Sequence, residues 1–267
     1  MWPFSSKNKD TQTAQLRSAT KELGYDLAQM YYYYDYMSNI QPWSTHISNT
    51  RKYIMGCAIK CAEKRTCAVL GSGYCIDVPL LELSRTFQKV YLMDIQHPQK
   101  VQQKARELGN VILITEDITK IAIETVNSIN RYKDFAVDLL MSSPNYSEGK
   151  YCDMLGTFDY VVSVNTLAFL AKPVIKYLNS VSLIDDISSH TLESFVHQYH
   201  INMLPKGKSC TISPISKRLY NSEGLQMYDR SIAFIPKEEI QDPESWTWKY
   251  TNGNNERVEY GVKAWQH

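Results

Sequence analysis

Short apolar runs alternate with amphipathic stretches along the middle of the chain. The apolar runs, which are typical of buried strands, occupy residues 66–70, 89–95, 111–115 and 158–164. Helical spacing of apolar residues predicts helices over 78–88, 98–108, about 119–130 and 189–204, and a loop is expected over 142–156. Strands and helices in alternation are typical of a parallel sheet whose crossover helices cover both faces.

The two ends of the chain have other patterns. Residues 1–12 are polar and expected to be disordered, whereas apolar spacing predicts helices over 13–37 and 48–63, with Pro42 interrupting the chain between them. Near the C-terminus, strands are predicted at 210–213, 231–235 and 257–265. The late strands lack a helical pattern between them, which indicates an antiparallel excursion at one edge of the sheet.

These patterns together predict an α/β fold: a doubly wound, mostly parallel seven-stranded sheet with an antiparallel edge and an N-terminal helical cap. The chain has 267 residues, which fits one large domain with an added helical segment. We therefore assign residues 1–60 to the cap and residues 61–267 to the domain that contains the sheet.

Charge and hydropathy disfavour two classes of partner. The chain has 29 Lys and Arg residues against 28 Asp and Glu residues, so it lacks the basic excess that duplex binding requires, and nucleic acid is disfavoured as the main ligand. No apolar run reaches the roughly 18–20 residues that span a bilayer. The apolar residues at the N-terminus precede the charged ones, the reverse of a secretory signal, so we expect a cytoplasmic protein. The oligomeric state stays open.

The six cysteines do not form a convincing metal site. Cys57 and Cys61 are four residues apart on a predicted helix and share a face, but the nearby position 64 is Lys64 rather than a third ligand. We interpret the cysteines as small buried hydrophobic residues and predict no metal.

A glycine turn follows the first predicted strand. Ligands of such sheets bind beyond the carboxyl ends of the strands, where the winding direction reverses. In the sequence Gly71-Ser72-Gly73, the glycines allow a sharp turn and a close approach of the backbone to a ligand. The third glycine of a dinucleotide fingerprint is absent, because Ile76 stands there, so a nicotinamide dehydrogenase is a weak alternative.

Polar residues also follow the later strands. Asp94 ends the second strand, where a carboxylate can accept hydrogen bonds from both hydroxyls of a ribose. Asp117, after the third strand, could accept from an adenine amino group while Ile118 presses on the ring, or it could cap the next helix. The fourth strand runs into Asn165 and Thr166, which would face the reactive end of the ligand.

These segments, in order, resemble the class I S-adenosylmethionine-dependent methyltransferases over roughly residues 60–236. The glycine-rich first motif of the family is similar to VLGSGYCIDVPL, its acidic second strand to VYLMDI and its third strand to ITEDI. The fourth motif is similar to FDYVVSVNTLAFL, and the turn before the fifth strand is similar to MLPKGKSCTIS. Val69 and Leu70 replace the usual acidic residue before the glycines. The proline-rich signature after the fourth strand is missing, which argues against N-methylation of a base or a glutamine amide.

The resemblance implies S-adenosylmethionine as methyl donor, S-adenosylhomocysteine as product and an unidentified small molecule or protein side chain as acceptor. The residues that it implies for donor binding are Gly71, Ser72, Gly73, Asp77, Asp94, Ile95, Asp117, Ile118, Asn165 and Thr166. Two alternatives stay open: a nicotianamine-synthase-like aminopropyl transferase that uses the same donor, and a non-catalytic relative that serves as a binding protein.

A general base is needed only if the acceptor atom starts protonated. Candidates are His190, His197 and His200 on the helix predicted before the fifth strand, although such histidines are more often packed or surface residues. Four consecutive tyrosines, from Tyr31 to Tyr34, lie in the predicted cap. They are interpreted as an aromatic wall over a substrate, with Tyr34 as a candidate catalytic residue, or as amphipathic packing.

Overall fold

The computed structural model describes residues 6–132, 150–233 and 240–267, and at its centre lies an eight-stranded sheet. Its strands are β1 (Thr66–Leu70), β2 (Lys89–Asp94), β3 (Val111–Thr115), β4 (Tyr160–Val164), β5 (Ser209–Tyr220), β6 (Gln226–Ser231), β7 (Gln241–Thr251) and β8 (Arg257–Gln266). The strand order is β3-β2-β1-β4-β5-β8-β7, and β6 pairs with β5 beside this path. Strands β1 to β5 pair in parallel, while β6, β7 and β8 pair in antiparallel fashion.

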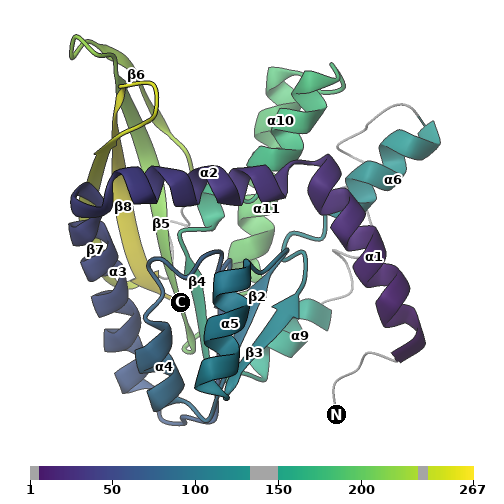
Figure 1. The fold of residues 1–267 in the computed structure, drawn as a ribbon, viewed down its shortest axis with the longest axis vertical. Coiled ribbons are helices and arrows are strands. Elements are labelled where there is room, and N and C mark those ends of the chain that lie inside the picture. The colour runs from purple at the N-terminus through teal and green to yellow at the C-terminus, as the bar shows by residue number, and fades with distance from the viewer. Residues whose placement is uncertain (1–5, 133–149, 234–239) are drawn as a thin grey trace.

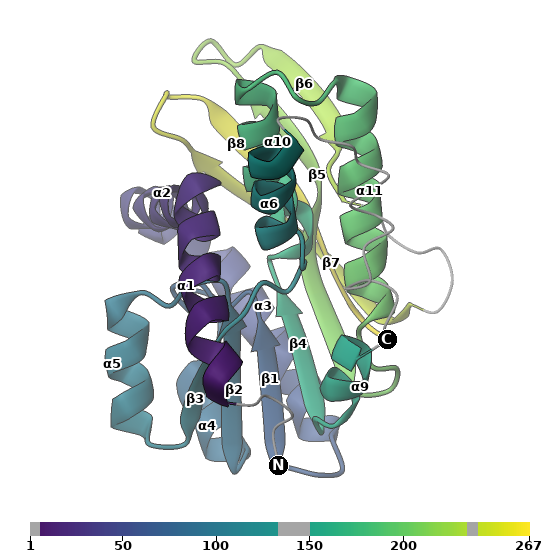
Figure 2. The same ribbon diagram turned by 90° about the vertical axis from the view of Figure 1, so that its right-hand side faces the viewer.

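Helices cover both faces of the sheet (Figure 2). They are α1 (Ser6–Glu22), α2 (Tyr25–Ser38), α3 (Ile40–Lys60), α4 (Leu80–Thr86), α5 (Gln99–Leu108), α6 (Ala122–Tyr132), α9 (Lys150–Gly156), α10 (Lys172–Ser180) and α11 (Asp186–Asn202), with a short 3₁₀ turn, η1 (Leu167–Phe169). Helices α4 and α5 lie on one face of the parallel strands, and α9 and α11 lie on the other. The predicted doubly wound sheet with an antiparallel edge is confirmed, with eight strands among the described residues rather than seven.

The central strands are apolar because both of their faces are covered. Cys67, Ala68, Val69 and Leu70 of β1 are fully buried, and every residue of β4 is buried as well. A strand covered on both faces is a continuous apolar run rather than an alternating one. This explains why β1 to β4 were predictable within one or two residues. Strand β5 begins within one residue of the prediction but extends to Tyr220 instead of ending at residue 213.

The N-terminal helices share a hydrophobic core with the sheet. Helix α3 packs against β7 (Figure 1). Its Trp43, Ile54 and Ala58 are fully buried in the same core cluster as the strands. In the described parts of the chain, no helix combines the length and the apolar character needed to cross a membrane.

Three predictions at the N-terminal end need correction. The expected helix over 13–37 is divided in two, because Gly24, a poor helix former, lies between α1 and α2. Pro42 does not interrupt the chain, since it lies in the first turn of α3, where its missing N–H group has no helical partner to lose. Helix α1 begins at Ser6, inside the segment expected to be disordered, and residues 1–5 lie outside the described residues.

The C-terminal half also differs from the prediction. The strand expected at 231–235 is wrong, since β6 ends at Ser231, and 234–235 lie outside the described residues. Strand β7 was not predicted, although Trp246, Trp248 and Tyr250 alternate with polar residues along it; most of its other residues are exposed. Helix α10 was also missed, and α9 occupies the end of the loop expected over 142–156, of which 142–149 are not among the described residues.

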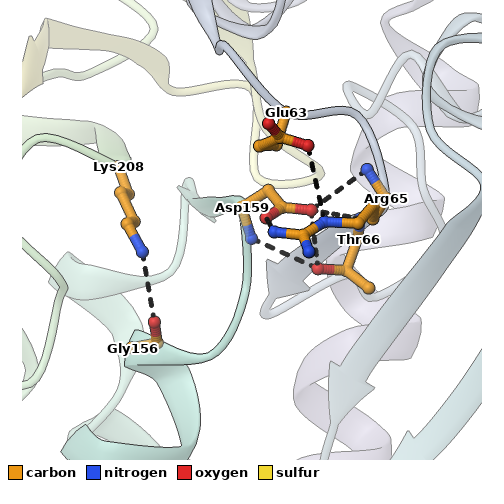
Figure 3. A network of polar contacts seen from close by, with 6 residues as sticks. All are labelled: Glu63, Arg65, Thr66, Gly156, Asp159 and Lys208. Atoms are coloured by element: carbon orange, nitrogen blue, oxygen red, sulfur yellow. Dashed lines mark hydrogen bonds and ion pairs between the residues drawn. The ribbon is translucent and has the colours of Figure 1, made fainter.

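A polar network fixes the amino ends of β1 and β4 (Figure 3). The Asp159 carboxylate accepts hydrogen bonds from the backbone N–H groups of Arg65 and Thr66 at 3.0 and 2.9 Å, and Arg65 Nη2 lies 3.0 Å from its second oxygen. Burial raises the pKa of Asp159, but the hydrogen bonds and the Arg65 charge outweigh it, so the pKa lies below its usual value. This carboxylate is therefore ionised and holds the two strands in register at their start.

Buried histidines make the fold sensitive to acid. His200 is 1% exposed and its Nε2 lies 2.7 Å from Ser163 Oγ. His46 of α3 is equally buried and stacks on Trp248 of β7. Burial lowers the pKa of both side chains to about 3. Both histidines are neutral in the folded protein, whereas each would be protonated in the unfolded chain below about pH 6.5.

We expect His200→Gln to make the protein less sensitive to acid. Because the folded pKa lies below the unfolded one, unfolding takes up a proton, and stability falls as pH decreases from about 6.5 toward 3. Between pH 7 and pH 5 the wild-type protein should lose about 2 kcal/mol more unfolding free energy than His200→Gln. Urea denaturation at both pH values measures this difference. His190→Gln, on the exposed side of α11, is the control, and an equal acid response of all three proteins would refute the prediction.

Candidate active site

A cavity of about 370 Å³ opens at the carboxyl ends of the parallel strands. The chain moves from β1 outward to β2 and β3, then returns to β4 on the other side of β1, so the winding reverses between β1 and β4. The polar turns after these strands diverge at this point, which is where ligands of open α/β sheets bind. Helix α2 crosses above these strand ends and supplies one wall of the cavity (Figure 1).

The turn after β1 needs glycine at two positions for different reasons. Gly71 has φ +71°, and a Cβ there would lie 1.7 Å from Thr166 Oγ1, so the turn after β1 packs directly on the turn after β4. Gly73 has φ +46°, but a Cβ there would meet nothing within 4 Å. Its backbone borders the cavity, so a ligand can approach it closely.

Asp94 joins the end of β2 to both the glycine turn and helix α2. One carboxylate oxygen accepts the Gly73 backbone N–H at 2.7 Å, and the other accepts the Gln29 side-chain amide at 2.7 Å. Gln29 also accepts a hydrogen bond from Gln96 Nε2 at 3.2 Å. Burial raises the pKa of Asp94, and the hydrogen bond from Gly73 partly offsets this.

Asp117 lines the cavity but is engaged with its own loop. Its oxygens accept hydrogen bonds from the Thr119 backbone N–H at 2.8 Å, from the Thr119 hydroxyl at 2.5 Å and from the Ala122 backbone N–H at 2.7 Å. These bonds satisfy free N–H groups at the start of α6, as a capping residue does. A carboxylate has about four lone-pair sites, so acceptance from a ligand amino group is compatible with this role.

A buried polar chain lies beneath the turn after β4. The Asn165 side-chain amide donates to the Asp77 carboxylate and lies 2.9 Å from Nε2 of His46, whose Nδ1 accepts from the Trp246 indole at 3.0 Å. Asn165 itself has φ +47°, a strained conformation for a residue other than glycine. Burial raises the pKa of Asp77, against hydrogen bonds from Asn165 and Tyr32.

The far half of the cavity is aromatic. Its rings come from α2, from η1 and from the antiparallel strands: Tyr32, Phe169, Trp248, Tyr250 and Tyr260. Trp248 and Tyr260 are paired across β7 and β8, with ring centroids 5.0 Å apart, and Tyr250 lies 5.5 Å from Trp248. Asp35 of α2 lines the cavity beside these rings.

The structure brings together the residues that the sequence indicated for donor binding. Gly71, Ser72, Gly73, Asp77, Asp94, Ile95, Asp117, Ile118, Asn165 and Thr166 all line the cavity. The described residues contain no group of three or more His, Cys, Asp or Glu side chains with metal-binding geometry.

The residues suggested for catalysis are not brought there. Tyr34 is 57% exposed, because α2 turns Tyr32 rather than Tyr34 toward the sheet. His190 is exposed on α11, and His197 is buried on the same helix; neither lines the cavity. His200 is hydrogen bonded to Ser163 in the core.

Two groups of cavity residues were not predicted. Tyr25 and Gln29 come from α2, where no sequence signal distinguishes an inward side chain from a solvated one. Trp248 and Tyr260 come from the antiparallel edge; the aromatic residues of WTWKY and VEY were the available signal, but only the pairing of β7 with β8 places them at the cavity.

No protein-family model matches the chain, and no match was found among curated protein sequences. Several solved structures are similar in overall trace. One is the N-methyltransferase NodS from Bradyrhizobium japonicum WM9 in complex with S-adenosylhomocysteine, with 10% identity, a TM-score of 0.43, and coverage of 95% of this chain and 98% of that one.

Another is the 1,6-didemethyltoxoflavin-N1-methyltransferase of Burkholderia thailandensis, also with S-adenosylhomocysteine bound. It has 12% identity and a TM-score of 0.40, and the match covers 100% of this chain and 92% of that one. The DhpI complex with S-adenosylhomocysteine has 10% identity and a TM-score of 0.38, and the match covers 92% of this chain and 95% of that one. Since identity is low in each case, what this cavity binds must be inferred from its own residues.

The two glycines of the turn should respond differently to alanine. Gly73→Ala should cost about 1–2 kcal/mol of unfolding free energy from backbone strain alone. Gly71→Ala should cost about 2–5 kcal/mol, because its new Cβ also displaces Thr166. Denaturant titration of both variants measures the difference. Equal losses would mean that the contact between the two turns is not a constraint on the fold.

Proposed function

We propose that this chain is an S-adenosylmethionine-dependent methyltransferase acting on a small molecule or a protein side chain. The observation that carries the proposal is the convergence of Gly73, Asp94 and Asn165 on one cavity at the point where the sheet reverses its winding. The cavity volume of about 370 Å³ lies within the range of small-molecule sites. The motifs described in the sequence analysis support the same donor.

Asp94 is the proposed ribose acceptor. It ends β2 beside the open backbone of Gly73, and each of its oxygens accepts a hydrogen bond from a neighbouring N–H group. A ribose hydroxyl can replace the Gln29 amide on one oxygen while Gly73 keeps the other. Gln29, with its amide on α2, would then be free to bond to the sugar itself.

Ile95 and Ile118 are the proposed walls of the adenine site. Both are buried, apolar and part of the cavity lining, one after β2 and one after β3. Asp117 next to Ile118 offers its remaining lone pairs to the adenine amino group. β2 and β3 pair in parallel, so the apolar Ile95 and Ile118 and the polar Asp117 follow neighbouring strand ends.

S-adenosylmethionine would supply an already activated methyl group on a positively charged sulfur. The protein then needs mainly to align the two reactants and exclude water. Asp77 and Asp94, both lining the cavity, favour a positively charged ligand there. Helix α2 lies over the strand ends (Figure 1) and, in this proposal, covers the cavity, which its half-buried Tyr25 and Tyr32 line.

The deciding experiment is calorimetric titration of the protein with S-adenosylhomocysteine, followed by product analysis after incubation with S-adenosylmethionine. Binding together with release of S-adenosylhomocysteine is the expected result. Release of methylthioadenosine instead would assign aminopropyl transfer. Absence of binding of either compound would refute the proposed function.

Asp94→Ala should weaken binding of S-adenosylhomocysteine by about 1–3 kcal/mol, because the ribose hydroxyls lose their acceptor. Calorimetry measures the change, with circular dichroism to verify that the variant is folded. Asp229→Ala is the matched control, since that carboxylate is exposed on β6 and does not line the cavity. An Asp94→Ala variant that binds as tightly as the wild type would remove the ribose assignment.

A further inference from the structure

We propose that the aromatic half of the cavity is an acceptor subsite for an organic cation, an amine carried on a flat or hydrocarbon scaffold, with its charge against Asp35. The assignment as an acceptor subsite rests on the proposed function. The binding of a cation by this half of the cavity does not depend on it.

The rings form a contiguous cluster rather than isolated side chains. Trp248 contacts Tyr32, Tyr250 and Tyr260, with centroid distances of 6.3, 5.5 and 5.0 Å, and Phe169 lies 6.3 Å from Tyr260. All of them line the same cavity. The negative faces of such rings attract a cation. Trp248 is buried and stacked on His46, with ring centroids 4.2 Å apart, so the half-buried rings of Tyr32, Phe169 and Tyr250 are the ones that a ligand can reach.

The ring hydroxyls are largely committed elsewhere. Burial raises the pKa of Tyr32, whose hydroxyl is hydrogen bonded to Asp77, and it also raises the pKa of Tyr250, whose hydroxyl is hydrogen bonded to Tyr260. The phenols are therefore neutral. The cluster offers a ligand ring faces and edges more than free hydroxyl groups.

The charges along the cavity are mainly negative. The carboxylates in its lining are Asp35, Asp77, Asp94 and Asp117, and the described lining contains a single cation, Lys172, which lies 2.7 Å from Glu193. The positive charge of Lys172 is therefore already balanced. The field in the cavity favours cations over anions.

Asp35 is the carboxylate in this half that is open to a ligand. Asp77 is occupied by Asn165 and Tyr32, whereas no side-chain hydrogen bond or ion pair of Asp35 is found within the described residues. Burial raises the pKa of Asp35 and the nearby charge of Lys217 lowers it, with a net increase. Lys217 acts on Asp35 without a direct ion pair among the described residues, and a bound cation would supply one.

The antiparallel edge already holds protein cations over its tyrosines. Lys217 Nζ lies 5.7 Å from the ring centre of Tyr260 and 5.6 Å from that of Tyr228, and Arg230 lies 5.3 Å from Tyr228. Among the described residues, the positive charge near Asp35 that opposes the proposal is that of Lys217. A ligand cation must therefore gain enough from the rings and from Asp35 to outweigh it.

The test compares two probes of nearly equal shape, phenethylamine and 2-phenylethanol, which differ in charge. Binding is followed by the tryptophan fluorescence of the full chain, to which Trp248 in the cavity wall contributes, at pH 7.5 with and without S-adenosylhomocysteine. The wild type should bind the amine about tenfold more tightly than the alcohol. Asp35→Asn should reduce this preference to less than about twofold. Asp26→Asn, on the same helix but outside the cavity lining, should retain it.

Equal affinity of the wild type for the two probes would overturn the proposal even if no variant folds. A preference that persists in a folded Asp35→Asn protein would overturn the role of Asp35. If S-adenosylhomocysteine does not bind, the proposed function fails, yet the titration without it still tests cation recognition. If S-adenosylhomocysteine binds and the amine preference is absent, only the present inference fails.

Discussion

The contact between Gly71 and Thr166 is the constraint on which the rest of the site depends. It joins the turns after β1 and β4, the two strands between which the sheet reverses its winding. Gly71 and Asn165 both have left-handed backbone, with φ of +71° and +47°, so the chain leaves each strand sharply. Because these turns pack against each other at their base, the residues beyond them surround a cavity.

The two ends of the parallel strands use carboxylates in opposite ways. At the amino end, Asp159 receives hydrogen bonds and the charge of Arg65, which lower its pKa and make it a structural anchor. At the carboxyl end, Asp77 and Asp94 are buried with raised pKa values and neutral hydrogen-bond donors. Buried carboxylates with shifted pKa values in a cavity are typical of functional sites.

Helix α2 connects two chemically different halves of the cavity. It contributes Gln29 to the polar half formed by β1, β2 and β3, and Tyr32 and Asp35 to the aromatic half formed with β7 and β8. Movement of this helix would therefore expose both halves together. Its consecutive tyrosines point in every direction around the helix axis, so no single apolar stripe marks the inward face, and the sequence could not identify that face.

The sequence by itself determined the parallel half of the sheet and the polar residues at its carboxyl edge. Strands buried on both faces are continuous apolar runs, and the residue that follows each run must lie at that edge, so Gly71, Asp94 and Asn165 could be assigned by position. Only the tertiary structure decided the aromatic half. Most residues of β7 are exposed apart from its alternating aromatic residues, and Trp248 reaches the cavity through its pairing with Tyr260 across strands. Such contacts, like the exclusion of Tyr34 and His197 from the site, depend on which faces of distant elements meet, and periodicity along one segment does not contain that information.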